Sequence, residues 1–148
     1  MDNKEIKVLI FSINGEYYAT DIMEVERILG YEETTKLPEI PSFVEGVINY
    51  EGNILPIINL AKKFNLPFTE RKEDSKIIVA KQNDSKIGVI VDVVSEVKDI
   101  KVEKIETPPE IVAGISRRYI RGLIKIDGKI IIFLNFATIL TEEERKFL

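Results

Sequence analysis

The chain has 148 residues, a length that suits one compact domain or two very small ones and excludes a multidomain enzyme. It contains no His and no Cys, which excludes imidazole bases, thiolate nucleophiles, disulfides and His- or Cys-based zinc sites. With 21 Lys and Arg against 25 Asp and Glu, the net charge is −4, so no overall positive field favours nucleic acid as the main partner. The apolar run near the N-terminus is short and ends at Gly15, which predicts neither a signal peptide nor a membrane span and favours a cytoplasmic protein.

The residue types favour strands over helices. The chain has 25 Ile and 12 Val, a quarter of its residues, and these β-branched side chains suit a pleated strand better than a helix. We therefore predict a mainly β core.

Four hairpins are predicted along the chain, each with a tight turn between two short apolar runs. Asn-Gly and related pairs tolerate the positive φ angles that two-residue turns require. The predicted turns are Asn14-Gly15, Glu51-Gly52, Asn83-Asp84 and Asp127-Gly128.

The hairpins recur at nearly constant separations, which indicates an internal repeat. One shift along the sequence places Asn14 on Asn83, and a slightly longer shift places Gly46 on Gly122. We predict two copies of one β unit, over residues 8–66 and 77–140, joined by a polar linker near 67–75 within a single domain. Each copy holds about five strands, which suits a small SH3-like barrel. Two such barrels would have to share a hydrophobic core, because each is marginally stable alone.

Two short helices are predicted. Residues 59–64 form a helical pattern that ends before Pro67. Thr141 and Glu144 have the spacing of a capping box, which predicts a C-terminal helix through Phe147.

No set of residues in the sequence predicts catalysis or metal binding. Asp21, Glu24 and Glu26 are close together but lack the loop pattern of a calcium site, and Asp21 is more simply the cap of a helical turn. The sequence contains no glycine-rich phosphate loop and no nucleophile elbow. We therefore predict a non-enzymatic binding protein without a metal or a cofactor.

Two other functions stay open at this point. A small barrel can bind nucleic acid, but Arg117, Arg118 and Arg121 form a basic patch with only one aromatic residue among them, which favours a solvated loop. A carboxylate-based hydrolase would require clustered acids with shifted pKa values in a pocket.

One segment resembles a known family signature. Residues 43–60, FVEGVINYEGNILPIINL, resemble the signature of the CheW family of chemotaxis coupling proteins, which runs roughly G-v-i-N-l-R-G-x-i-l-P-v-i-d-L. Segments 14–19, 35–38, 87–92 and 119–122 are similar to further family elements, so that the resemblance covers nearly the whole chain.

The resemblance implies two SH3-like five-stranded β-barrels around a shared core and an adaptor function. It implies that chemoreceptors (methyl-accepting chemotaxis proteins) are coupled to the histidine kinase CheA, with no direct insertion into the membrane. The kinase regulatory domain would bind a barrel end, and the cytoplasmic tip of the receptor would bind a groove between the barrels. We expect Val25, Ile28 and Val91 in the receptor groove.

The chain departs from the family pattern at two positions together. Glu51 stands where many members have Arg, and Arg27 stands where many members have Glu. If the two side chains face each other, an ion pair survives with reversed polarity. We expect Arg27, Gly46, Asn49 and Glu51 at a kinase or receptor interface, where a reversed charge would change partner choice.

Overall fold

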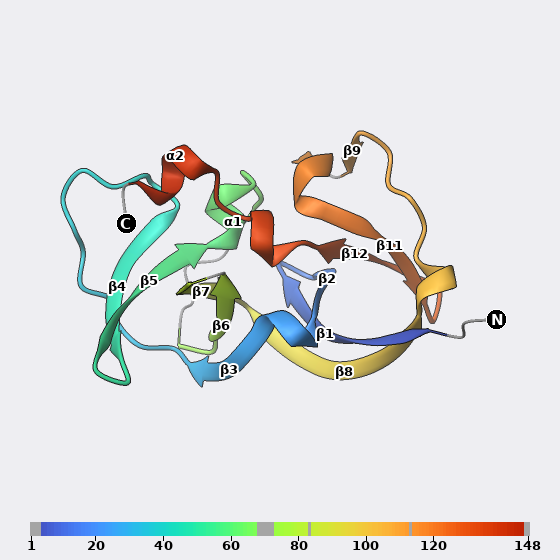
Figure 1. The fold of residues 1–148 in the computed structure, drawn as a ribbon, viewed down its shortest axis with the longest axis horizontal. Coiled ribbons are helices and arrows are strands. Elements are labelled where there is room, and N and C mark those ends of the chain that lie inside the picture. Colours follow the sequence, from blue (N-terminus) through green and yellow to red (C-terminus); the bar gives the residue numbers. More distant parts are fainter. Residues whose placement is uncertain (1–3, 68–72, 83, 113, 147–148) are drawn as a thin grey trace.

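The structure is a computed structural model, and it describes residues 4–67, 73–82, 84–112 and 114–146. Ten strands form the body of the molecule (Figure 1). They are β1 (Glu5–Ile13), β2 (Glu16–Asp21), β3 (Val25–Gly30), β4 (Val44–Tyr50), β5 (Asn53–Asn59), β6 (Lys76–Gln82), β7 (Ser85–Val91), β8 (Val93–Lys101), β11 (Ile120–Ile126) and β12 (Lys129–Leu134).

The remaining elements are short. They are a two-stranded hairpin, β9 (Ile111–Val112) and β10 (Ile115–Ser116), the 3₁₀ turns η1 (Ile22–Glu24), η2 (Val102–Lys104), η3 (Arg117–Tyr119) and η4 (Phe136–Thr138), and the helices α1 (Leu60–Lys63) and α2 (Glu142–Arg145).

The ten strands form two five-stranded sheets of equivalent order. Sheet A runs β11-β12-β2-β1-β8, and sheet B runs β4-β5-β7-β6-β3. The predicted mainly β fold with two five-stranded units is confirmed, although each sheet is an open series of strands and not a closed barrel.

The expectation that each sequence copy builds its own barrel is wrong. Sheet A takes the hairpin β1–β2 from the first predicted copy and β8, β11 and β12 from the second. Sheet B takes β6–β7 from the second copy and β3, β4 and β5 from the first. The two copies therefore exchange their first hairpins, and the chain crosses between sheets at η1 and again between β7 and β8.

The two sheets have β-bulges and parallel strand pairs at equivalent positions, related by the same sequence offsets as the two copies. The register shift between Val44 and Gly46 in β4 recurs between Ile120 and Gly122 in β11, at the positions that the sequence repeat makes equivalent. The parallel pair Phe133↔Ala19 in sheet A corresponds to Ile57↔Gly88 in sheet B. Because bulges are specific backbone features, their recurrence shows that the two sheets are built on one pattern.

The predicted turns have the expected conformations where the structure describes them. Asn14, Glu51 and Asp127 have φ angles of 49°, 50° and 49°, and each is followed by a glycine with positive φ. Strands β6 and β7 pair as predicted up to Gln82↔Ser85, while Asn83 lies outside the described residues. Residues 68–72 of the predicted linker also lie outside them.

The described residues form three hydrophobic clusters. The largest lies between the sheets and includes Phe11, Tyr18, Ile58 and Phe136, which are almost fully buried, so the predicted shared core is present. A smaller cluster lies on the other face of each sheet, built around Phe133 in sheet A. The corresponding cluster in sheet B surrounds Ile48, Leu55, Ile57 and Ile77. Each sheet therefore buries apolar side chains on both of its faces, which explains its nearly continuous apolar runs.

Both predicted helices are present, and the second is described over Glu142–Arg145, while Phe147, where its predicted end falls, lies outside the described residues. Asn59 caps α1 by accepting a hydrogen bond from the backbone N–H of Lys62, and Thr141 and Glu144 form the predicted capping box of α2. Lys63, almost fully buried, forms an ion pair with Glu144 at 2.5 Å and lies over the rings of Phe43 and Tyr119. This contact holds α2 against α1.

Candidate functional site

The tip of the β4–β5 hairpin and the edge strand β3 bring the two exchanged charges together. Strand β3 has a register shift between Val25 and Arg27, an irregularity of the kind that redirects side chains along a strand. The guanidinium of Arg27 lies 3.4 Å from the carboxylate of Glu51, and both side chains are about half exposed. The guanidinium also lies 5.7 Å from the centre of the Tyr50 ring. The two positions predicted to face each other do so.

Glu51 is an unusual residue for its backbone conformation. Its φ of 50° equals within a degree that of Asn14 and Asp127, which occupy the same turn position in two other hairpins. Asn and Asp tolerate this left-handed region because their short side chains bond the local backbone, whereas Glu does not share this advantage. The longer Glu side chain instead reaches Arg27.

Beneath this ion pair lies a second polar contact. The hydroxyl of Tyr50 donates a 2.6 Å hydrogen bond to the carboxylate of Glu26, and Lys86 donates another at 3.0 Å. The hydrogen bonds from Tyr50 and then Lys86 lower the pKa of Glu26, and the bond to Glu26 raises the pKa of Tyr50. The carboxylate is therefore held in its charged form and anchors β3 to β4 and β7.

The other two predicted interface residues support the backbone. Asn49 is exposed, but its side-chain oxygen accepts a 3.0 Å hydrogen bond from the N–H of Gly52 and so holds the turn. Gly46 is buried at a φ of 142°, and an added Cβ would collide with the backbone oxygen of Thr35. Gly46 thus permits the approach of a loop and presents no side chain to a partner.

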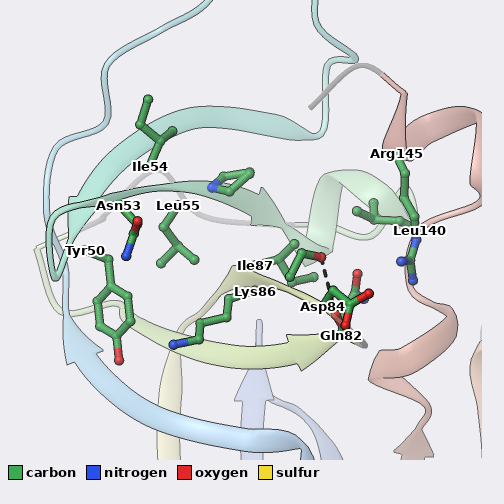
Figure 2. Close-up of a pocket in the computed structure, with 12 residues that line it drawn as sticks. Tyr50, Asn53, Ile54, Leu55, Gln82, Asp84, Lys86, Ile87, Leu140 and Arg145 are labelled. Atoms are coloured by element: carbon green, nitrogen blue, oxygen red, sulfur yellow. Dashed lines mark hydrogen bonds between the residues drawn. The ribbon is translucent and has the colours of Figure 1, made fainter.

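An open pocket lies beside this hairpin (Figure 2). Strands β5 and β7 pair only over Ile57–Asn59 and Gly88–Ile90, so their first residues diverge and leave the pocket between them. Its lining includes Leu55 and Ile87, the exposed Ile54, and Arg145 from α2. The lining also includes Tyr50 and Asn53, which flank the turn that contains Glu51.

The predicted groove residues differ in their exposure. Ile28 on β3 is 41% exposed and Val25 is partly buried against the shared core, but Val91 is only 1% exposed. The expectation that Val91 offers an apolar surface is wrong, because in β7 its side chain packs into the core.

Three exposed apolar residues on η1 and β8 were missed from the sequence. Met23 on η1 is 77% exposed, and Val93 and Val97 on β8 are 53% and 49% exposed. Figure 1 draws β3, η1 and β8 along the lower side of the molecule, where the two sheets meet. The repeat itself contained a signal for one of them, since the shift that places Asn14 on Asn83 also places Ile28 on Val97.

The acidic residues considered for metal binding have structural partners. Asp21 caps η1 and pairs with Arg121 at 3.1 Å. Glu24 accepts a 3.0 Å hydrogen bond from the N–H of Ala137, and burial raises its pKa. Within the described ranges, no group of three acidic residues is arranged to hold a metal ion.

The basic patch is likewise engaged in contacts within the chain. Arg121 lies over the ring of Phe133 at 4.5 Å, and Arg118 lies over Tyr119 at 5.3 Å.

Among the described residues, no helix has the length and apolar character needed to cross a membrane.

Comparison with known proteins decides the family. A model of the CheW-like domain matches residues 7–144. The chain belongs to the CheW-like domain family. It is 36% identical to a CheW chemotaxis protein of Thermotoga maritima over 142 residues, which cover 94% of this chain and 90% of that protein. It is 33% identical to a CheW protein of Klebsiella aerogenes, over 92% of this chain and 82% of the relative.

A solved CheW-like structure has the same fold. The scaffolding protein TtCheW of Thermoanaerobacter tengcongensis matches with a TM-score of 0.88 and 34% identity, over 97% of this chain and 92% of that one. The family assignment confirms the predicted fold class and the prediction of a non-enzymatic chemotaxis adaptor. It gives no support to the nucleic-acid alternative or to a hydrolase.

Proposed function

We propose that this CheW-like chain couples the cytoplasmic tip of chemoreceptors to the regulatory domain of the histidine kinase CheA. It works in the cytoplasm and joins membrane receptor arrays only through its partners. The observation that carries the proposal is the family match over residues 7–144, on a fold whose two sheets are fixed by one shared core. A rigid body with separate surfaces suits a scaffold, because it sets the distance between two bound partners.

The receptor tip binds along β3, η1 and the start of β8. Ile28, Met23 and Val93 are exposed apolar side chains on these elements, and Val25 lies beneath them. Exposed apolar side chains grouped on one side fit the apolar stripe of a helix, which is recognised through residues spaced three and four apart.

The kinase regulatory domain binds the tip of the β4–β5 hairpin. Arg27 and Glu51 supply the charges, Asn49 holds the turn, Gly46 allows its packing, and Ile54, 77% exposed, supplies an apolar contact. As an exposed ion pair, Arg27 and Glu51 contribute only about 0–1 kcal/mol to stability. Their larger effect is on partner choice, since charges at an interface rim repel partners with the wrong polarity.

Exchange of the two charges tests the kinase interface. We expect Arg27→Glu and Glu51→Arg each to weaken binding of the regulatory domain of the cognate CheA, measured by titration calorimetry at low salt, because each leaves two like charges together. The double exchange restores the ion pair within the chain but inverts the polarity seen by the partner, so it should not fully restore binding. Lys7→Glu is the control, because Lys7 forms an exposed ion pair with Asp99 in the other sheet. If all three exchange variants bind like the parent, these residues are not at the interface.

A separate variant tests the receptor surface. We expect Ile28→Glu to reduce binding of a receptor signalling-tip fragment while leaving kinase binding intact, because it places a charge among apolar contacts. Ile130→Glu is the matched control, since Ile130 is 58% exposed on the distant β11–β12 hairpin. Equal receptor binding by the Ile28 variant and the parent would contradict the assignment.

A further inference from the structure

The last strand of sheet A has an open edge. β8 has nine residues, and β1 pairs along one of its sides from Glu5↔Lys101 to Ser12↔Val93. Within the described part of the chain, no strand pairs along its other side, and Figure 1 draws β8 at the lower rim of the molecule. Such an edge presents backbone N–H and C=O groups that can pair with another strand.

The register shows which residues of β8 present these groups. Ile13 and Glu16 flank the two-residue turn between β1 and β2 and form its closing hydrogen-bonded pair. Because bonded and non-bonded pairs alternate, Leu9 also directs its N–H and C=O to β2. Val97 lies opposite Leu9 on the other side of β1, so it directs its own backbone groups to the open edge.

We propose that two copies of this chain associate by antiparallel pairing of their β8 edges about a twofold axis at Val97. In this register Glu96 lies opposite Lys98 of the second copy, and the reverse pair repeats across the axis. Opposite charges facing each other across two strands stabilise their pairing. The exposed Val97 lies opposite the same residue of the second copy, and its side chain is 49% exposed in the single chain.

The charged side chains of Glu96 and Lys98 remain accessible in the single chain. Lys98 lies 3.9 Å from Glu96 and 3.8 Å from Asp127, both long separations for an ion pair, and all three side chains are at least one third exposed. Each is therefore accessible to a facing charge from a second copy.

The equivalent edge strand, β3, does not offer this complementarity. In the alignment of the two sequence copies, its Arg27 and Leu29 correspond to Glu96 and Lys98. Pairing β3 with β8 would place Arg27 opposite Lys98, and pairing β3 with itself would place Arg27 opposite Leu29. Of these two equivalent edges, β8 is the one that matches its own copy, and a twofold contact of this kind closes as a dimer without forming a fibre.

The register shift between Ile10 and Phe11 limits the interface, because it bends β8 beyond Ser95. The dimer is therefore small and depends on concentration. It goes beyond the coupling function, and it would cover Val97 beside the surface proposed for the receptor.

Sedimentation equilibrium of the purified chain tests the proposal without either partner. We expect the apparent mass to rise from 16.9 kDa toward twice that value between about 10 μM and about 1 mM, the range in which weak interfaces form. Glu96→Lys should abolish the rise, as should Lys98→Glu, because each places like charges opposite each other. The double exchange, Glu96→Lys with Lys98→Glu, restores complementarity and should dimerise again. A parent that stays at 16.9 kDa, single variants that dimerise like the parent, or a monomeric double variant with a native circular dichroism spectrum would each overturn the proposal.

Cross-linking provides an independent measurement. The chain has no Cys, so Val97→Cys introduces the only thiol. Directly opposed residues in a hydrogen-bonded antiparallel pair have Cα atoms about 5.5 Å apart, which a disulfide can span. We expect added diamide to convert the Val97→Cys variant to a covalent dimer, whereas Ile28→Cys, at the equivalent position of β3, stays monomeric. Equal cross-linking of the two variants would contradict the assignment to β8.

Discussion

The substitution Gly88→Ala tests how tightly the interior of sheet B is packed. Gly88 in β7 pairs with Ile57, and a Cβ built there would lie 2.6 Å from the Cδ1 atom of Ile57 and 2.8 Å from the Cγ2 atom of Ile77. Both neighbours have no exposed surface, so neither can move aside into solvent. Sheet A has Ala19 at the equivalent position, fully buried and paired with Phe133. One sheet therefore accepts a methyl group that the other excludes.

The expected loss of stability follows from two opposing effects. Forcing an extra methyl group into a packed core costs about 1–3 kcal/mol. Replacing Gly lowers the entropy of the unfolded chain and returns about 0.4–1 kcal/mol. Taking the middle of each range, we expect Gly88→Ala to lower the free energy of unfolding by about 1–2 kcal/mol. For a chain of this length, each kcal/mol lowers Tm by about 2–4 °C.

Urea unfolding followed by circular dichroism measures this loss. Gly30→Ala is the matched control, because Gly30 lies at the end of β3 with nothing within 4 Å of its added Cβ. We expect this control to be as stable as the parent or slightly more stable. If Gly88→Ala unfolds at the same urea concentration as the parent, Ile57 and Ile77 repack without cost and the reasoning is refuted.

Three further measurements test other parts of the fold. For Glu144, burial alone would raise the pKa, but hydrogen bonds from Lys63 and Thr141 outweigh it and lower the pKa below 4.5. The charged form of Glu144 thus stabilises the fold at neutral pH, and this contribution is lost as the pH falls through the lowered pKa. Glu144→Gln should therefore reduce the free energy of unfolding at pH 7 and make it fall less steeply toward acid pH. Parallel curves of unfolding free energy against pH for the parent and the variant would contradict this. Burial, followed by the charge of Glu16, raises the pKa of Tyr18 to about 12, so one of the five tyrosines should ionise only on alkaline unfolding in an absorbance titration. Reversible ionisation of all five below about pH 11 would show that Tyr18 is not buried. A chain cut at a protease site placed within residues 68–72 should remain one particle and unfold in one transition, whereas separation into two folded pieces would contradict the exchange of hairpins.

Local structure was predictable because its causes are local. The turns at Asn14 and Asp127 follow from residues that tolerate positive φ, and the cap at Thr141 follows from its spacing to Glu144. The likeness of the two copies was also visible in the sequence, since Gly46 and Gly122 are related by a constant shift, and the bulges of the structure recur at the same shift. The contact between Arg27 and Glu51 was expected only from the family resemblance, because no local sequence pattern predicts that these two residues lie together.

The assignment of strands to sheets was not predictable in the same way. Alternation of apolar and polar residues fixes which face of a strand is buried, but it does not choose between two partner strands of equivalent pattern. β3 could pair with the hairpin β1–β2 of its own copy or with β6–β7 of the other, and it pairs with β6. Val91 was misplaced for a related reason, because a continuous apolar run such as 87–91 gives no alternation from which exposure can be inferred.

The exchange of hairpins bears directly on what a scaffold must do. Because each sheet contains strands from both halves, neither sheet can move far without breaking the pairing of β3 with β6 or of β1 with β8. The crossings that make this exchange, at η1 and at the start of β8, carry the exposed Met23 and Val93. The receptor surface proposed above is thus formed where the chain passes between the sheets, and the hairpin tip proposed for the kinase belongs to one of those sheets. Partners bound at the two surfaces would be held at a fixed separation by the same shared core that makes the chain fold as one unit.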